Sequence, residues 1–395
     1  YGINYTRDCI DTLMSIKDSV NYEIIVVNNQ SDNEVNSYLE KAIDRITLIN
    51  VPEKLSAAKA INLAAKSARG TYLILINNDT IPLNGCLDRL IETAQSDSAI
   101  SVVGSRLLNP LHRLVQHAGI IYNDKKEPVL FYQGFPDDHA HVIKPRDFQS
   151  VISASMLIRA DHFIQMNGFD ERFQDSFEDL DFCLRVLQAG WRVTYQPKSV
   201  LFYHAEALPQ NYNPASADGC SFLELWENKV QCDDHIYFKQ DNYELTRSED
   251  GVSIRPRNIN LKLKLDAARE SLKDGNLQLA SKRYEEIYYL IPHTPIVMRY
   301  LARIYESRGD FEKATVMLLR LSAMEPSAEV LLKLADFALK QKQFDLSRRF
   351  AEGVIEAVKA SVSRTAEAWA IIGDTWFKEN KFEMAEQEYL LAINA

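Results

Sequence analysis

Asp79 stands at a place where a carboxylate could meet a ligand. The sequence YLILINNDTIP, residues 72–82, begins as an apolar, strand-like run and then breaks into Asn77-Asn78-Asp79-Thr80 before a proline. Because strand interiors are poor in Asn and Asp, the simplest interpretation is a turn. The alternative is that Asp79 lies at the carboxyl end of a buried strand, where ligands bind in open α/β sheets.

A second acidic sequence, FEDLDF, carries Glu178, Asp179 and Asp181. The apolar residues in and after it recur at helical spacing, which predicts a helix that begins here and stops at Gly190. Acidic residues in a first helical turn complement the helix dipole, and this structural role alone would explain them.

Two histidines are further candidates. His117, in QHAGIIY, would by itself suggest a general base, because imidazole titrates near neutral pH. His204 ends the strand-like run SVLFYH, where a lone histidine is more simply a buried or surface residue.

The overall composition, with 46% hydrophobic and 25% charged residues among 395, is that of an ordinary soluble protein of two or three domains. No apolar run approaches the roughly 18 residues that span a bilayer. We therefore expect a cytoplasmic protein without a transmembrane segment, with peripheral attachment to the inner membrane or to an assembly complex as a further option.

The net charge of −10 arises entirely in the first 260 residues, which carry 25 basic and 35 acidic side chains against 20 and 20 in the rest. An acidic region binds nucleic acid poorly, so no nucleic-acid partner is expected. A phosphorylated ligand would need a metal ion to offset the repulsion. The five cysteines form no C-x-x-C pair, which argues against a disulfide framework and against a thiolate zinc site.

The first part of the chain alternates strand-like and helical segments. Residues 22–29 and 71–79 are short, β-branched and unbroken, as in strands buried on both faces, and further strands are expected at 100–108 and 150–160. Residues 55–70 are rich in alanine and predict a helix. We expect strands 22–29 and 71–79 to form a parallel, right-handed βαβ unit in an α/β domain.

Residues 261–395 lack strand signals and repeat with a period of 34 residues. The matched positions are Ala280, Tyr284, Ile287 and Pro292 with Ala314, Leu318, Leu321 and Pro326, and Gly275 with Gly309. This spacing is typical of tetratricopeptide repeats. We expect about four repeats, the last incomplete, after a linker at 236–260. Because the chain starts at Tyr1 with a helix and no strand before it, we also expect a fragment.

Six sequences follow one another in the order typical of one enzyme family: TRDCIDTL, YEIIVVNNQSDN, ARGTYLILINNDT, QHAG, MNGFDERFQDSFEDLDFCLRVLQAGWRV and PKSVLFYH. They resemble the family 2 glycosyltransferases with the GT-A fold, especially bacterial rhamnosyltransferase-type members. The resemblance covers roughly residues 5–230, and the block 167–204 is its most specific part. It implies a GT-A domain at residues 1–235 that uses a nucleotide-diphosphate sugar as donor.

By that resemblance, Asp79 takes the place of the last carboxylate in the metal-binding acidic triplet. The family more often has Asp where Asn77 and Asn78 stand. One carboxylate can suffice, since a hard cation such as Mn²⁺ or Mg²⁺ keeps several waters and also binds the diphosphate oxygens. His204 falls where some members supply an imidazole ligand. The implied metal ligands are therefore Asp79 and His204.

The resemblance also places the catalytic base in FEDLDF. Transfer with inversion needs a carboxylate that takes the proton from the attacking hydroxyl, on the sugar face opposite the departing diphosphate. We expect Asp179 to be this base, supported by Glu178, with Asp181 as the reserve candidate; the sequence does not separate them. Because the family's base is a carboxylate, we expect His117 to be structural.

The implied donor site consists of Asn28, Asn62, Asn78, Asp79 and Ser155. Asn28 stands where the family commonly has an acid that binds the nucleotide base, and an amide oxygen can still accept that hydrogen bond. Ser155 lies in SAS, where many members have Gly-Ala-Cys beside the donor sugar. Asn62 resembles a family Asn near the donor, although a solvated helix face explains it equally well.

We therefore expect a metal-dependent, inverting bacterial glycosyltransferase, in which residues 205–219 form a loop over the donor or an ordinary linker. The repeats would recruit a protein acceptor, such as a flagellin-type subunit, or another protein partner. One alternative is a transferase that extends a polysaccharide or O-antigen. Another is a scaffold with a decayed transferase domain, favoured by Asn28, Asn77 and Asn78 in place of acids. A nucleotidyltransferase is disfavoured because a glycine-rich, basic phosphate loop is missing.

Overall fold

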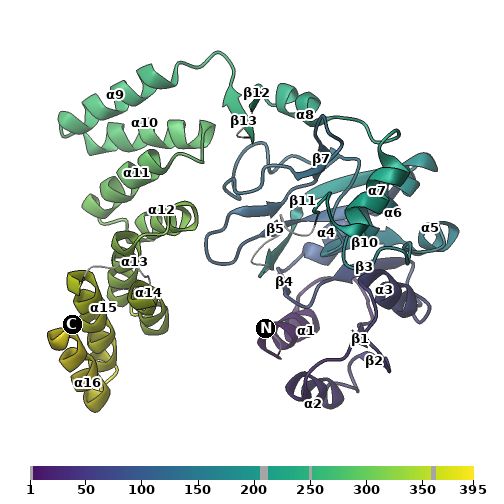
Figure 1. Ribbon diagram of the computed structural model, residues 1–395, viewed down its shortest axis with the longest axis horizontal. Coiled ribbons are helices and arrows are strands. Elements are labelled where there is room, and N and C mark those ends of the chain that lie inside the picture. The colour runs from purple at the N-terminus through teal and green to yellow at the C-terminus, as the bar shows by residue number, and fades with distance from the viewer. Residues whose placement is uncertain (1–2, 205–211, 249–250, 357–361) are drawn as a thin grey trace. The chain divides into compact units, whose positions relative to one another are not determined.

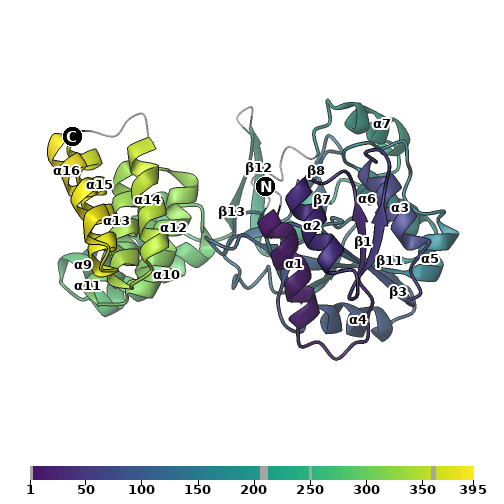
Figure 2. The same ribbon diagram turned by 90° about the horizontal axis from the view of Figure 1, so that it is seen from below.

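The computed structural model describes residues 3–204, 212–248, 251–356 and 362–395. The chain divides into two compact units, Tyr1–Arg255 and Pro256–Ala395, and each is described by itself (Figures 1 and 2). Among the described helices, none combines the length and the apolar character that a membrane crossing needs.

The first unit alternates short strands with helices (Figure 1), which confirms the expected α/β class. Its helices are α1 (Ile3–Ser15), α2 (Asn33–Lys41), α3 (Ala57–Ala65), α4 (Cys86–Ser96), α5 (Ala160–Gln165), α6 (Glu178–Gln188), α7 (Ala217–Trp226) and α8 (Asp234–Gln240). Its strands are β1 (Ile25–Asn28), β2 (Thr47–Asn50), β3 (Tyr72–Ile76), β4 (Thr80–Pro82), β5 (Ile100–Leu108), β6 (Val115–His117), β7 (Ile120–Tyr122), β8 (Pro128–Leu130), β9 (Arg146–Asp147), β10 (Ser155–Arg159), β11 (Arg192–Tyr203), β12 (Tyr243–Ser248) and β13 (Gly251–Pro256).

The main sheet is mixed and holds β3, β10, β5, β11 and β4 in that order. β10 runs antiparallel to β3 and β5, whereas β11 runs parallel to β5 and antiparallel to β4. Neighbouring residues alternate between the two faces: Val103 and Leu157 pack in a cluster with α4, and Val102 and Met156 pack in a cluster with α6. Because helices cover both faces, the strands read as unbroken apolar runs.

The parallel unit expected from residues 22–29 and 71–79 is not observed. β1 pairs in parallel with β2 instead, and the helix between them is α2. β3 pairs antiparallel with β10, and the described residues show no ladder between β1 and β3. The parallel βαβ unit is therefore formed by β1, α2 and β2. The prediction missed it because β2, with the four residues TLIN, is too short to give a clear strand signal in the sequence.

Residues 236–260, expected as a linker, hold the end of α8 and the hairpin of β12 and β13. Helix α8 packs beside β12. Tyr243 of β12 joins an aromatic cluster with Phe131, Tyr132 and Phe238. Up to Arg255, this stretch belongs to the first unit.

The second unit consists of helix pairs (Figure 1). They are α9 (Leu261–Lys273) with α10 (Leu277–Leu290), α11 (Pro295–Ser307) with α12 (Phe311–Met324), α13 (Ala328–Lys340) with α14 (Phe344–Glu356), and α15 (Val362–Lys378) with α16 (Phe382–Asn394). The matched small and large apolar positions are all buried, namely Ala280, Tyr284, Ile287, Ala314, Leu318 and Leu321. The tetratricopeptide architecture is thereby confirmed.

The turn inside each helix pair places a residue with positive φ at the same point. This residue is Gly275 (73°) and Gly309 (76°) in the first two pairs, but Lys342 (61°) and Asn380 (63°) in the last two. The left-handed conformation costs a residue with a Cβ atom roughly 1–2 kcal/mol, whereas glycine adopts it freely. The last two helix pairs therefore form the same turn with Lys342 and Asn380 in place of glycine.

We expect Lys342→Gly to raise the free energy of unfolding by up to about 1 kcal/mol, because glycine relieves the strain at the position after the C-cap of α13. Urea unfolding of the full chain measures the change. The matched control is Lys340→Gly in the last turn of α13, which should lower the free energy of unfolding by about 1 kcal/mol. Equal destabilisation by both variants would contradict the account.

Candidate functional site

Asp79 and His204 are brought together where two strands end. β3 stops at Ile76, and the Asn77 carbonyl oxygen accepts hydrogen bonds from the Thr80 N–H (3.1 Å) and hydroxyl (2.7 Å), which closes a turn before β4. The His204 N–H donates to the Asp79 carbonyl oxygen at 2.9 Å. The turn expected from the sequence is confirmed, and it holds Asp79 beside the end of β11.

One oxygen of the Asp79 carboxyl group is unsatisfied. Burial raises the pKa of this group, while a hydrogen bond from its own backbone and the charge of His204 act in the opposite direction. Oδ1 is buried and has no hydrogen-bond partner within the described residues. The His204 ring contacts that of Tyr5, with ring centres 4.6 Å apart. A cation would satisfy the orphaned oxygen, so Asp79 and His204 fit a divalent metal ion as a carboxylate and an imidazole ligand.

Tyr203 connects this edge with the acidic start of α6. Burial raises the pKa of Tyr203 above its ordinary value, and the charges of Asp79 and Asp179 raise it further. Hydrogen bonds of two adjacent residues link the same two places: the Asn77 N–H donates to the Ala154 carbonyl oxygen at 3.0 Å, and the Ser153 N–H donates to the Asp179 carboxylate at 2.8 Å. The fold thus brings two candidate functional carboxylates into one site, although 100 positions separate them in the sequence.

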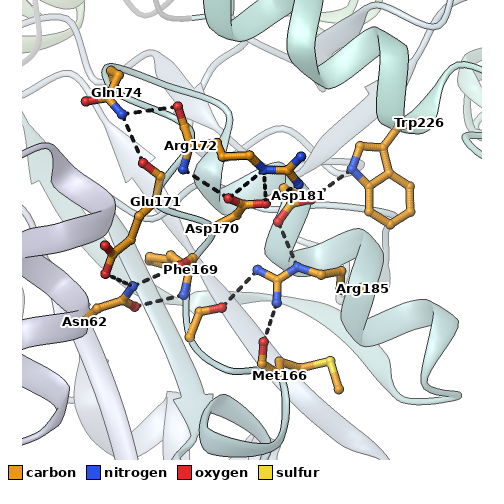
Figure 3. Close-up of polar contacts among 11 residues, drawn as sticks. Asn62, Met166, Phe169, Asp170, Glu171, Arg172, Gln174, Asp181, Arg185 and Trp226 are labelled. Atoms are coloured by element: carbon orange, nitrogen blue, oxygen red, sulfur yellow. Dashed lines mark hydrogen bonds and ion pairs between the residues drawn. The ribbon is translucent and has the colours of Figure 1, made fainter.

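Asp181 is tied into the structure by both of its oxygens (Figure 3). Arg185 Nε donates to one oxygen at 2.8 Å, and Trp226 Nε1 donates to the other at 2.9 Å. The other guanidinium nitrogens of Arg185 donate to the carbonyl oxygens of Met166 (2.7 Å) and Gly168 (2.9 Å). Asp181 therefore anchors α6 to α7 and to the loop after α5.

Asp179 is buried and accepts three hydrogen bonds. Its Oδ2 accepts from the Ser153 N–H and the Tyr212 hydroxyl, both at 2.8 Å, and its Oδ1 accepts from the Leu180 N–H at 2.9 Å. Burial raises the pKa of Asp179, and these three donors counteract that rise by stabilising the charged form.

Glu178 is also buried, but its pKa is higher. Burial is the main cause, followed by the charge of Asp179 and then those of Asp218 and Asp175, and together they raise the pKa of Glu178 to about 8. At neutral pH this carboxyl group is therefore mostly protonated and can donate a hydrogen bond.

Two residues that the motifs did not single out set the start of α6. Phe177, just before the helix, is buried and has a φ of 72°, a strained value for a bulky residue. The Asp218 carboxylate of α7 accepts hydrogen bonds from the N–H groups of Gln174, Asp175 and Ser176, which hold the chain in place just before Phe177. In the sequence Asp218 resembles an ordinary acidic residue in a first helical turn.

Asn62 and Ser155 face neighbouring protein groups. Asn62 exchanges two hydrogen bonds with the backbone of Phe169, at 2.8 and 2.9 Å, and donates to Glu171 at 3.1 Å (Figure 3). Ser155 is buried, and its hydroxyl lies 2.7 Å from that of Ser105. Each holds two segments together, β10 on β5 for Ser155 and α3 on the loop after α5 for Asn62.

Asn28 and Asn78 lie at strand ends. Asn28 donates to the side chains of Asn36 and Asn50 at 2.7 and 2.8 Å, so it fixes the ends of β1 and β2 to α2. Asn78 lies in the turn that contains Asp79 and donates to the Thr6 hydroxyl of α1 at 2.9 Å.

His117 has the surroundings of a structural residue. Burial lowers its pKa to about 4, so the ring is neutral. Its Nδ1 lies 2.8 Å from the Ser105 carbonyl oxygen, and its Nε2 accepts from the Ile152 N–H at 3.4 Å. Of the loop expected over the donor at 205–219, residues 205–211 lie outside the described residues. Residues 212–216 precede α7, whereas residues 217–219 form the first turn of that helix and are not part of a loop.

We expect the high pKa of Glu178 to show in the pH dependence of stability. The folded-state value of about 8 exceeds the ordinary value of 4.5, so the stability that the protonated group provides is present at low pH and is lost as the pH rises through about 8. In urea unfolding between about pH 5 and pH 8, the free energy of unfolding should fall more in the unmodified chain than in Glu178→Gln. Parallel pH profiles of the two proteins would show that Glu178 ionises normally.

Comparisons with known proteins address the first unit. Residues 3–159 match the model of glycosyl transferase family 2. The chain is 29% identical over 223 residues to "O-antigen biosynthesis protein RfbC" of Myxococcus xanthus, covering 52% of this chain and 17% of that protein. It is 26% identical over 159 residues to "Pre-mycofactocin glycosyltransferase" of Mycobacterium tuberculosis, covering 38% of this chain and 31% of that protein.

Among solved structures, GalNAc-T7 with UDP, GalNAc and Mn²⁺ aligns with a TM-score of 0.46 at 12% identity, covering 59% of this chain and 47% of that chain. The chain spans less than a third of the length of the two curated relatives. The matched family model ends at the last residue of β10, within the first unit. Residues 3–159, within the first unit, thus match glycosyl transferase family 2, and the second unit consists of helix pairs of the tetratricopeptide type.

Proposed function

We propose that the chain is a cytoplasmic inverting glycosyltransferase that moves a sugar from a nucleotide-diphosphate sugar to an acceptor hydroxyl. The observation that carries this proposal is that the turn holding Asp79, with its unsatisfied oxygen, is joined to Asp179 through adjacent residues, since Asn77 bonds Ala154 and Asp179 accepts from Ser153. Asp79 would then act at the diphosphate of the donor, and Asp179 would act at the acceptor hydroxyl. The family 2 match supports the donor class.

Asp79 and His204 are the proposed ligands of a divalent cation, Mn²⁺ or Mg²⁺. When bound, the cation would offset the negative charge of the departing diphosphate. The excess of acidic side chains in the first 260 residues would otherwise repel such a ligand. Donor binding should therefore require the cation.

Asp179 is the proposed general base. Asp181 is less suited because Arg185 and Trp226 engage its two oxygens. Glu178 is less suited because a pKa of about 8 keeps it mostly protonated at neutral pH, so it would act as a neutral neighbour of the base. The described donors to Asp179 are neutral groups, whereas Asp181 pairs with the Arg185 guanidinium, and burial raises the pKa of Asp179, which makes it the stronger base.

Direct donor contacts are proposed for Asn28 and Asn78, both of which lie where strands end. Asn62 and Ser155 would act on the donor site through the segments that they hold together. For Asn62 this segment is the loop at Phe169–Glu171, a few residues before the acidic start of α6.

The repeats are proposed to recruit a protein acceptor or a partner protein, because stacked helix pairs present an extended surface to other chains. A glycan acceptor of the O-antigen type is the second candidate, favoured by the name of the Myxococcus relative. In either case the chemistry at Asp179 is the same, because both acceptors present a hydroxyl group.

We expect Asp79→Asn to lower the release of nucleoside diphosphate from the donor at least about a hundredfold, because the substitution removes the charge that would hold the cation. Asp44→Asn, at an exposed position after α2, is the matched control and should keep full activity. Circular dichroism checks the fold. Unchanged turnover in a folded Asp79→Asn protein would refute the assignment.

Asp179→Asn and Asp181→Asn should fail in different ways. The first should lower kcat by about 10²- to 10⁴-fold and leave metal-dependent donor binding in place, because only proton transfer is lost. The second should lower the free energy of unfolding by about 2 kcal/mol or more, because Arg185 loses its buried partner. Steady-state kinetics and urea unfolding of both variants separate the two roles. A stable, inactive Asp181→Asn beside an active Asp179→Asn would reverse the assignment.

A further inference from the structure

Three side chains that could bind a metal ion gather at the start of α8, and none belongs to the residues proposed for sugar transfer. They are Cys232, Asp234 and His235. Cys232 Sγ lies 3.5 Å from Asp234 Oδ1 and 3.8 Å from His235 Nδ1, and that nitrogen lies 3.6 Å from Asp234 Oδ1. We propose that these three side chains bind a zinc ion.

The three distances match one face of a tetrahedral zinc site. Zinc binds sulfur at about 2.3 Å and nitrogen or oxygen at about 2.0–2.1 Å, so tetrahedral ligands lie roughly 3.5 Å apart when one is sulfur and roughly 3.4 Å apart otherwise. The observed separations of 3.5, 3.8 and 3.6 Å exceed these values by about 0.3 Å at most. Small side-chain rotations would bring all three ligands to bonding distance.

Asp234 is oriented for this role by its neighbours. It is buried, and Arg247 Nη2 donates to its Oδ2 at 2.6 Å, which leaves Oδ1 on the side of the sulfur and the imidazole. Oδ1 also accepts from the His235 N–H at 2.6 Å. Arg247 Nε in turn contacts Asp124 at 3.0 Å. Metal-binding carboxylates are commonly held by such outer hydrogen bonds.

The chemistry of the three ligands selects zinc. A thiolate and an imidazole favour a borderline-soft ion, whereas Mn²⁺ and Mg²⁺ prefer oxygen ligands. The His235 side chain is 57% exposed, so a water molecule can complete the fourth position. Binding forms a zinc–sulfur bond and sends the Cys232 thiol proton to solvent. Without the ion, the thiol donates a hydrogen bond to Asp234.

The expectation against a thiolate zinc site rested on the missing C-x-x-C pair. The set C-x-D-H uses one cysteine and mixes three ligand types, which a search for paired cysteines does not find. Cys232 comes just before α8, and residues three apart at a helix start lie on the same side, which brings it to His235.

Zinc at this place would stabilise the first unit. The ion would join the segment before α8 to the first turn of the helix. Between the ligands, Asp233 accepts hydrogen bonds from the Tyr122 N–H (2.7 Å) and the Gln149 side chain (2.6 Å), so this turn is already tied to the core. A ligand that binds only the folded state raises its stability.

Cobalt titration of the full chain tests the proposal, because Co²⁺ accepts the same ligands and a cobalt–thiolate bond has a charge-transfer absorption. Asp79 and His204 contain no thiol, so binding there would not produce this signal. We expect one equivalent of Co²⁺ to give the absorption and Zn²⁺ to abolish it. Cys232→Ser should remove the absorption and weaken zinc binding at least about tenfold. Cys220→Ser, an exposed cysteine on α7, is the matched control and should retain both.

Thermal unfolding provides a second measurement. Micromolar Zn²⁺ should raise the Tm of the unmodified chain and of Cys220→Ser but not that of Cys232→Ser or His235→Ala, with circular dichroism as the test of folding. Absence of the cobalt–thiolate absorption in the unmodified chain, or equal zinc affinity in Cys232→Ser, would overturn the proposal. Loss of the absorption in Cys220→Ser would assign the thiolate to another cysteine and would overturn it as well.

Discussion

The hydrogen bond from the His204 N–H to the Asp79 carbonyl oxygen, 2.9 Å long, fixes the geometry on which the candidate site depends. It joins the end of β11 to the turn after β3, and the antiparallel pairing of β11 with β4 continues from it. This arrangement holds the Asp79 side chain with one oxygen buried and unsatisfied. It also places Tyr203, the residue before His204, in the buried cluster that contains Phe177 and Leu180 at the start of α6.

Burial of three acidic residues within one helical turn is the second constraint, because desolvation disfavours every buried charge. The structure resolves the three cases differently. Asp181 is paired with Arg185, Asp179 is stabilised by three hydrogen-bond donors, and Glu178 is left with a pKa of about 8. Within this turn of α6, Asp181 therefore holds neighbouring segments together, Asp179 accepts hydrogen bonds as a carboxylate, and Glu178 stays mostly protonated at neutral pH.

Local patterns were sufficient to predict the α/β class, the strand that ends before Asp79, the helix that starts at Glu178 and the repeat helices. Each of these rests on the spacing of apolar residues over a few turns or one strand. The side-chain partners could not be predicted in this way, because they come from remote parts of the chain. Asn62 bonds Phe169, 107 positions away, and Asp218 holds a loop more than 40 positions earlier. Strand β2 was missed because four residues give too little periodicity.

The most direct test of the account is a calorimetric titration of the chain with UDP-, dTDP- and GDP-sugars, each in the presence of Mn²⁺ and again with a chelator. The account predicts that one class of donor binds and that the chelator abolishes its binding, because the acidic site needs a cation before it accepts a diphosphate. Donor binding that is unaffected by the chelator would contradict the proposed role of Asp79 and His204. Absence of binding to every donor would contradict the transferase function and favour a scaffold built on the repeats.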